Sequence, residues 1–164
     1  MKFSSQEEYG LRCLLNLARH YAPGESRTIQ QISNDEGLSV SYVGKLMRIL
    51  RLGGFLESVR GTEGGYSLSR PPGDIQISDV LDTLGGKLFE PDFCDRHSGV
   101  EEICTHDSAC AIRPLWSHIQ SAIDSALLDV TLVDLMDNHP HKQRPVPLSP
   151  QKIPSQPATV MSVK

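Results

Sequence analysis

Two short helical segments followed directly by a glycine-rich hairpin constrain the fold of this chain more than any other feature. Segments 28–36 and 39–52 carry apolar residues at helical spacing, and Gly37 and the pair Gly53 and Gly54 are suited to end them. Segments 55–60 and 66–68 favour β-strands on either side of a turn at 61–65. Helix, helix and hairpin in this order predict a winged helix-turn-helix.

Further helices are expected on both sides of this unit. Apolar spacing predicts one helix over 5–21 and another over 77–84, with Ser78 as the N-cap of the second. Pro114 suits the first turn of a longer helix that reaches about residue 130, and Thr131 caps a last helix over 132–137. The predicted fold class is therefore mostly α with a small β-hairpin wing: a winged helix-turn-helix plus a long C-terminal dimerisation helix.

The chain of 164 residues divides into four expected parts. Residues 1–84 form the DNA-binding domain, 85–112 a cysteine-rich loop, and 113–137 the dimerisation helix with the short terminal helix. Residues 138–164 hold six prolines without periodicity, which predicts a disordered tail. No signal segment or bilayer-length apolar run is present, so a cytoplasmic location without membrane contact is expected.

Charge is distributed unevenly along the chain. The net charge is −4, yet segment 38–70 has five basic residues against two acidic ones. Segment 90–107 instead has six acidic residues and a single arginine. A local basic surface is what a nucleic-acid reader needs, so the acidic total does not exclude double-stranded DNA as a partner.

The helix over 39–52 predicts which residues face DNA. If Val40, Val43, Met47 and Leu50 are buried, the opposite face of this helix is polar and basic. Arginine at the hairpin tip suits a minor groove, and the glycines of the turn would let the backbone approach the duplex. The predicted DNA-binding residues are Ser39, Ser41, Tyr42, Lys45, Arg48, Arg60 and Gly61. The alternative is a solvated helix followed by an incidental turn.

Three cysteines, Cys94, Cys104 and Cys110, stand close together in the polar loop. Thiolates suit zinc, Cu(I) and iron–sulfur clusters. Structural zinc sites normally have cysteine pairs two to four residues apart, which this spacing lacks, although His97 or His106 would complete a site of three cysteines and one histidine. The residues alone leave a cluster, a zinc site and unliganded thiols open.

The motif Ser39-Val40-Ser41-Tyr42, the tip Val59-Arg60-Gly61 and the segment 64–68 resemble the signature of the IscR/NsrR/RsrR-type winged-helix regulators, the Rrf2 family. The resemblance extends from residue 1 to about 138. It implies a bacterial transcription factor, not an enzyme, that binds an iron–sulfur cluster through the three loop cysteines. A [2Fe–2S] cluster is preferred and a [4Fe–4S] cluster is the alternative. A homodimer on a palindromic or near-palindromic operator is expected.

The fourth cluster ligand is the open question. IscR-like members use a histidine three residues after the last cysteine, where this chain has Arg113. NsrR-like and RsrR-like members use a carboxylate on the first helix of the partner subunit, and Glu8 stands at the matching position. RsrR-like members add a histidine where this chain has Arg12, and His106 is the reserve ligand. A further departure is Gly44, where IscR-like members can carry a glutamate that reads bases.

The resulting hypothesis is a transcription regulator whose operator binding is controlled by an iron–sulfur cluster that senses redox state, iron or nitric oxide. One alternative is a zinc- or thiol-responsive winged-helix repressor without a cluster. An alternative of another class is an iron–sulfur carrier or electron-transfer protein, which would leave the wing and the basic helix without a role. No nucleophile triad, phosphate loop or paired-carboxylate arrangement points to an enzyme.

Overall fold

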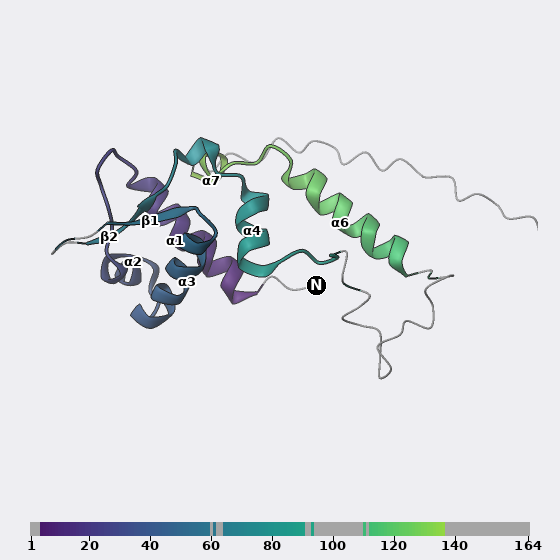
Figure 1. Cartoon of the computed structure of the whole chain (residues 1–164), viewed down its shortest axis with the longest axis horizontal. Coiled ribbons are helices and arrows are strands. Elements are labelled where there is room, and N and C mark those ends of the chain that lie inside the picture. The colour runs from purple at the N-terminus through teal and green to yellow at the C-terminus, as the bar shows by residue number, and fades with distance from the viewer. Residues whose placement is uncertain are drawn as a thin grey trace, which may run out of the picture.

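The computed structural model describes residues 4–59, 61, 64–90, 93, 110 and 112–136. In chain order its elements are α1 (Ser5–Arg19), α2 (Ile29–Glu36), α3 (Val40–Leu52), β1 (Leu56–Val59), β2 (Gly65–Leu68), the 3-10 helix η1 (Pro72–Asp74), α4 (Ile77–Gly85), α6 (Arg113–Leu127) and α7 (Leu132–Met136). The two strands form an antiparallel hairpin after α3, as Figure 1 shows. The mostly helical fold with a hairpin wing is confirmed.

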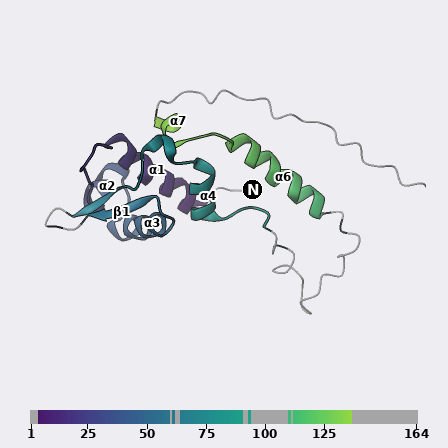
Figure 2. The same ribbon diagram turned by 45° about the horizontal axis from the view of Figure 1, so that its top comes forward.

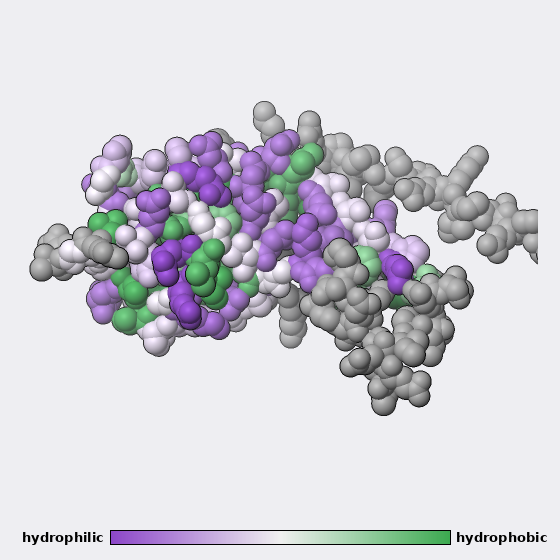
Figure 3. All heavy atoms as spheres, viewed as in Figure 1, coloured by the Kyte–Doolittle hydropathy of each residue, from purple (hydrophilic) through white to green (hydrophobic). Residues whose placement is uncertain are grey.

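Helix α1 lies at the centre of the helical domain, in contact with α2, α3, α4 and α7. Its apolar stripe supplies buried residues at helical spacing, among them Cys13, Leu14 and Leu17. These pack on the buried face of α3, whose members are Val43, Leu46, Met47 and Leu50. Hydrophobic side chains appear in Figure 3 as separate patches between hydrophilic ones on the visible face of this domain.

One residue of the predicted α3 stripe is not buried. Val40 is 45% exposed, whereas Leu46, which the pattern did not assign to the stripe, is fully buried. Val43, Leu46, Met47 and Leu50 follow the i, i+3, i+4, i+7 spacing of one helical face. Val40 shares that face but is the first residue of α3, where the described elements leave it uncovered, so its predicted burial is wrong.

The caps of the helix-turn-helix agree with the sequence prediction. Gly37 ends α2 in the left-handed conformation (φ 67°), which a glycine adopts without steric cost. Ser39 caps α3, where its hydroxyl accepts a hydrogen bond from the Tyr42 N–H at 3.3 Å. Thr28 and Gln31 form a reciprocal capping box at the start of α2. These local signals set the bounds of both helices.

The predicted N-cap of α4 is wrong. Ser78 lies inside the helix, and Gln76 is the N-cap without a side-chain hydrogen bond. The Ile77 N–H instead donates to the carbonyl of Val130 at 2.9 Å. This pairing with a distant part of the chain fixes the start of α4 at Ile77, so Ser78 becomes the second residue of the helix and not its cap.

The segment after α6 returns to the core. Gln76 and Thr131 form an isolated antiparallel bridge, and the Leu132 N–H donates to the Ile75 carbonyl at 2.9 Å. Leu132, the first residue of α7, is fully buried. The predicted capping role of Thr131 fits this start of α7, because its N–H and hydroxyl both donate to the Asp134 carboxylate.

Helix α6 lies apart from α1, α2 and α3, on the other side of α4 (Figures 1 and 2). None of its residues is buried, and it contacts α4. It ends at Leu127 rather than near residue 130, and Asp129 follows in the left-handed region (φ 61°). The predicted tail over 138–164 lies outside the described residues. No described helix is both long and apolar enough to cross a membrane.

Burial in the core predicts a pH dependence of stability. Desolvation, with the nearby Glu36 carboxylate as the next cause, raises the pKa of the Cys13 thiol from its ordinary 9.0 to about 12. The unfolded thiol loses its proton near pH 9, so the free energy of unfolding should fall as the pH rises from 9 to 12. We expect Cys13→Val to remove this part of the fall in denaturant titrations. Profiles that stay parallel over this window would contradict the burial of an un-ionised thiol.

Candidate DNA interface and ligand site

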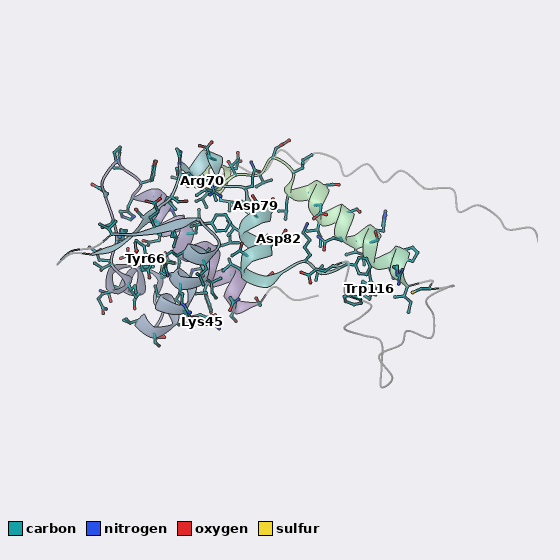
Figure 4. The ribbon with its side chains drawn as sticks, in the orientation of Figure 1. Lys45, Tyr66, Arg70, Asp79, Asp82 and Trp116 are labelled. Carbon is teal, nitrogen blue, oxygen red and sulfur yellow. The ribbon has the colours of Figure 1, made fainter. Side chains whose placement is uncertain are left out.

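The outer face of α3 carries the predicted DNA-binding residues. Ser41, Lys45 and Arg48 are exposed and are separated by four and three positions, which places them on one side of the helix. Figure 4 shows Lys45 projecting outward from this side. A hydroxyl, an ammonium and a guanidinium in a row can donate to phosphates and base edges in a major groove.

Ser39 combines a structural contact with this exposed face. Its hydroxyl oxygen accepts the Tyr42 N–H and lies 3.4 Å from the hydroxyl of Ser41. The hydroxyl hydrogen is not used by the cap and can be donated. The start of α3 thus presents two adjacent hydroxyls whose position is set by the cap.

Tyr42 is half-buried, unlike the other described candidates on α3. Its ring lies 6.0 Å from that of Tyr9 in α1, at an interplanar angle of 85°, which is an edge-to-face contact. The Arg12 guanidinium lies 5.4 Å from the centre of the Tyr9 ring. This contact between α1 and α3 could not be predicted from the sequence, because nothing in either local pattern pairs the two tyrosines.

The hairpin is joined to the loop before α2. The backbone of Arg27 donates to and accepts from Tyr66, at 2.9 and 2.8 Å. A Cβ at Gly65 would lie 2.4 Å from the Arg27 carbonyl oxygen, and one at Gly64 would lie 2.7 Å from the Val59 carbonyl oxygen. These two glycines therefore permit close contacts within the protein, a role different from the predicted approach to a duplex.

The tip of the hairpin is described only at Gly61. This residue is exposed and has a φ of 140°, which side-chain-bearing residues rarely adopt. Arg60, the predicted minor-groove residue, lies outside the described residues. Its role remains a prediction.

A polar network fixes α2 on α1. Arg12 binds the Glu36 carboxylate at 3.0 Å, and Arg27 binds the Asp35 carboxylate at 2.6 Å. The buried Asn16 amide donates to both Asp35 and Glu36, at 3.2 and 3.1 Å. Arg12, which occupies the position of a histidine ligand in RsrR-like members, is thereby committed to an ion pair.

The two glutamates at the start of α1 have different environments. Glu7 forms a capping box with Ser4, and its side chain lies so close to Gly85 that a Cβ there would meet it at 2.5 Å. Glu8 is exposed, and its carboxylate has no hydrogen-bond or ion-pair partner among the described residues. Of these two carboxylates, Glu8 is the one that can bind an external ligand.

Cys110 is the described member of the cysteine set. It is half-exposed, and its sulfur accepts a hydrogen bond from the Arg113 N–H at 3.3 Å. Backbone donors to ligand sulfurs help to set the potential of iron–sulfur clusters, so this environment fits a cluster thiolate. Cys94, Cys104 and His106 lie outside the described residues. Among the residues that the structure does describe, no three His, Cys, Asp or Glu side chains form a metal-binding group.

The apolar face of α6 is largely uncovered in a single chain. Leu115 is 54% exposed and Trp116 is 40% exposed, while Ile119 and Ile123 are half-buried. A contiguous apolar surface of this kind is a candidate contact surface for another protein chain.

Comparison with protein families gives one match over nearly the whole described chain. The sequence model of the family described as "Rrf2: Iron-dependent Transcriptional regulator" matches residues 3–138.

Individual relatives are transcriptional regulators and not enzymes. The protein Rrf2 of Nitratidesulfovibrio vulgaris is 34% identical over 136 residues, which cover 83% of this chain and 87% of the relative. The regulator CymR of Bacillus subtilis is 33% identical, with 82% and 89% covered. The regulator IscR of Vibrio atlanticus is 31% identical, with 85% and 77% covered.

Solved structures include the same two kinds of regulator. CymR, the global cysteine regulator of B. subtilis, superposes with a TM-score of 0.65 at 31% identity and covers 85% of this chain and 98% of its own. IscR of T. potens superposes with a TM-score of 0.63 at 28% identity, with 84% and 87% covered. The winged-helix fold is shared by both.

Two glycines near the candidate DNA interface should respond oppositely to alanine. A Cβ at Gly44 would meet only the Ile29 side chain at an ordinary 3.8 Å, so Gly44→Ala should stabilise α3 by about 1 kcal/mol through helix propensity. Gly65→Ala should destabilise the protein by about 1–3 kcal/mol, because the methyl group meets the Arg27 backbone. Denaturant midpoints measure both effects. Equal shifts for the two variants would contradict the described packing.

Proposed function

Because this chain belongs to the Rrf2 family of transcriptional regulators, whose members bind DNA and are typically dimers, we propose that it is a homodimeric transcription factor that reads DNA with α3 and the wing. The observation that carries this proposal is the exposed row of Ser41, Lys45 and Arg48 next to the Ser39 cap. The net charge of −4 makes general attraction to polyanions unfavourable, so binding depends on this local surface.

A second copy of the chain is the partner proposed for α6. The exposed Leu115 belongs to a helix without a buried residue, which supports an interface with another chain. Two-fold symmetry would place two α3 helices on successive half-sites, so a palindromic or near-palindromic operator is expected. The proposed division is DNA reading in 1–84, ligand binding in 85–112 and dimerisation in 113–137.

The proposed regulator of DNA binding is an iron–sulfur cluster held by Cys94, Cys104 and Cys110. Glu8 of the partner subunit is the proposed fourth ligand, with His106 in reserve. The Glu8 carboxylate, which has no partner within the described part of the chain, and the amide donor to Cys110 support this donor set. A [2Fe–2S] cluster is preferred over [4Fe–4S] because regulators of this type with an incomplete cysteine set commonly hold a [2Fe–2S] cluster. When bound, such a cluster supplies iron whose redox and ligation state changes with the cellular signal.

The residues around Glu8 offer a direct route to the recognition helix. Glu8 is bonded to Tyr9, whose ring contacts Tyr42 of α3. A changed position of the first turn of α1 would therefore alter the support of α3. A hundredfold change in operator affinity requires only about 3 kcal/mol of difference between two states.

A thiol-responsive regulator is the second candidate function. It is favoured by the similarity to CymR, the global cysteine regulator of B. subtilis, which is as strong as that to IscR. This candidate uses the same DNA-reading surface and differs in the ligand of the loop thiols. The carrier or electron-transfer alternative is not supported, because the relatives are regulators.

The DNA-reading surface is tested by charge removal. Lys45→Ala and Arg48→Ala should each weaken binding to the protein's own promoter region, and the loss of one phosphate contact should reduce the salt slope by about 1. Lys87→Ala is the matched control, since this exposed lysine pairs with Asp82 at the end of α4. Gel-shift titrations at several salt concentrations measure both quantities. Equal binding by all three variants would exclude this face of α3.

The hypothesis that the loop cysteines bind an iron–sulfur cluster is tested on protein purified without oxygen. Visible absorption in the parent protein is expected from a cluster, and Glu8→Ala should alter that spectrum or shorten the lifetime of the colour. A colourless parent protein would reject the cluster and favour the thiol-responsive candidate, which effects of thiol compounds on operator binding would then test.

Glu7→Ala is the matched control for Glu8. Loss of its capping box should lower the free energy of unfolding by about 1 kcal/mol without changing the spectrum. An unchanged spectrum for Glu8→Ala would instead indicate that His106 or an external group is the fourth ligand.

A further inference from the structure

Three aromatic side chains gather where the segment after α4 meets the start of α6. The ring centres of Phe89 and Phe93 are 5.4 Å apart, and those of Phe93 and Trp116 are 6.5 Å apart. Both distances lie in the attractive range for aromatic pairs. The Gln120 side-chain oxygen also accepts a hydrogen bond from the Phe89 N–H at 3.2 Å. We call Phe89, Phe93 and Trp116 the aromatic clasp.

The clasp stands apart from the hydrophobic core. Phe89 and Phe93 are half-buried, Trp116 is 40% exposed, and none of the three belongs to the core cluster. Figure 4 shows Trp116 at the N-terminal end of α6, close to the end of the segment that follows α4. Because the three rings lie outside the core cluster, the expected effect of their contact is local.

The clasp joins the two ends of the cysteine segment. Phe93 is bonded to Cys94, and Cys110 lies just before α6, where its sulfur accepts the Arg113 N–H. The contact between Phe93 and Trp116 therefore brings together the chain at both ends of 94–112. Closing such a loop costs conformational entropy. Without the clasp, this cost would oppose the binding of a ligand by cysteines at both ends of the loop.

We propose that the aromatic clasp is a positioning element that holds the chain on either side of the cysteine segment together before any ligand binds. Phe93 and Trp116 thereby raise the affinity of the thiols for a thiophilic ligand by preorganisation. The advantage for ligand binding rests on the proposed function of the loop thiols, but closure of the loop does not. An aromatic pair of this kind corresponds to about a three- to tenfold change in the closure equilibrium.

Closure is measured without the ligand. In a Cys104→Ser background, glutathione disulfide oxidises Cys94 and Cys110 to one intramolecular disulfide and is itself reduced to two glutathione thiols. The equilibrium constant gives the effective concentration of one thiol at the other. The buried Cys13 takes no part, because it is fully inaccessible. Mass spectrometry of tryptic peptides separates this disulfide from one between subunits.

Four variants separate the clasp from other effects. Phe93→Ala and Trp116→Ala should lower the effective concentration about three- to tenfold, while Trp116→Phe, which keeps a ring, should restore most of it. Leu88→Ala is the matched control, since Leu88 is 47% exposed in the same segment and is not part of the clasp. Values for Phe93→Ala and Trp116→Ala equal to the Leu88→Ala value would overturn the proposal, as would failure of Trp116→Phe to exceed Trp116→Ala.

Ligand binding is measured in a second arm with Cd²⁺ as the probe. The parent protein with all three loop cysteines should show thiolate-to-cadmium absorption in the ultraviolet, and the Phe93→Ala affinity should fall by the same factor as its effective concentration. Absence of this absorption in the parent would reject the loop thiols as ligands, while the disulfide equilibrium still decides whether the clasp closes the loop. An unchanged Cd²⁺ affinity despite a lower effective concentration would overturn the preorganisation.

Emission from Trp116, the one tryptophan in the chain, reports the clasp directly. Phe93→Ala should shift the emission to longer wavelength, because the indole becomes more exposed. Circular dichroism of the same samples establishes that the helical domain is folded. Emission that is identical in the parent and in Phe93→Ala would contradict the ring contact.

Discussion

The packing of α1 against α3 is the interaction on which the rest of the structure depends. Leu14 and Leu17 from α1 meet Leu46 and Leu50 from α3 in a core from which solvent is almost fully excluded. A buried side chain of this size contributes about 1.5–3 kcal/mol relative to exposure. Since α2, α4 and α7 also contact α1, each attaches to this pair, and the exposed face of α3 is presented on a fixed base.

The same elements that stabilise the domain also position the candidate functional groups. Ser39 both caps α3 and lies at the edge of the proposed DNA-reading face. Glu7 closes the first turn of α1 and leaves the adjacent Glu8 in solvent. Tyr42 supports α3 through its ring contact with Tyr9. Rearrangement of α1 would thus reach the reading face through packed side chains, without a long chain of intermediates.

Local sequence signals predicted the elements well and individual contacts less well. Gly37 and Ser39 delimit the helix-turn-helix because caps depend on residues within one turn. Ser78 failed as a cap because backbone pairing of Gln76 and Ile77 with residues 130 and 131, more than fifty positions away, sets the start of α4 at Ile77. Val40 failed as a core residue because helical spacing gives the side of a helix and not how far its neighbours extend along it.

The sequence by itself determined the winged-helix architecture, the membership of the Rrf2 family and the presence of three closely spaced thiols, because periodicity, turn residues and motif spacing are local properties of the chain. Only the tertiary structure decided that Glu8 rather than Glu7 lacks a partner among the residues that it describes, and that Gly65 serves the contact with Arg27. It also decided that Phe93 meets Trp116 across the cysteine segment. Such contacts join residues from different elements, so they depend on how the elements pack and are absent from any local pattern.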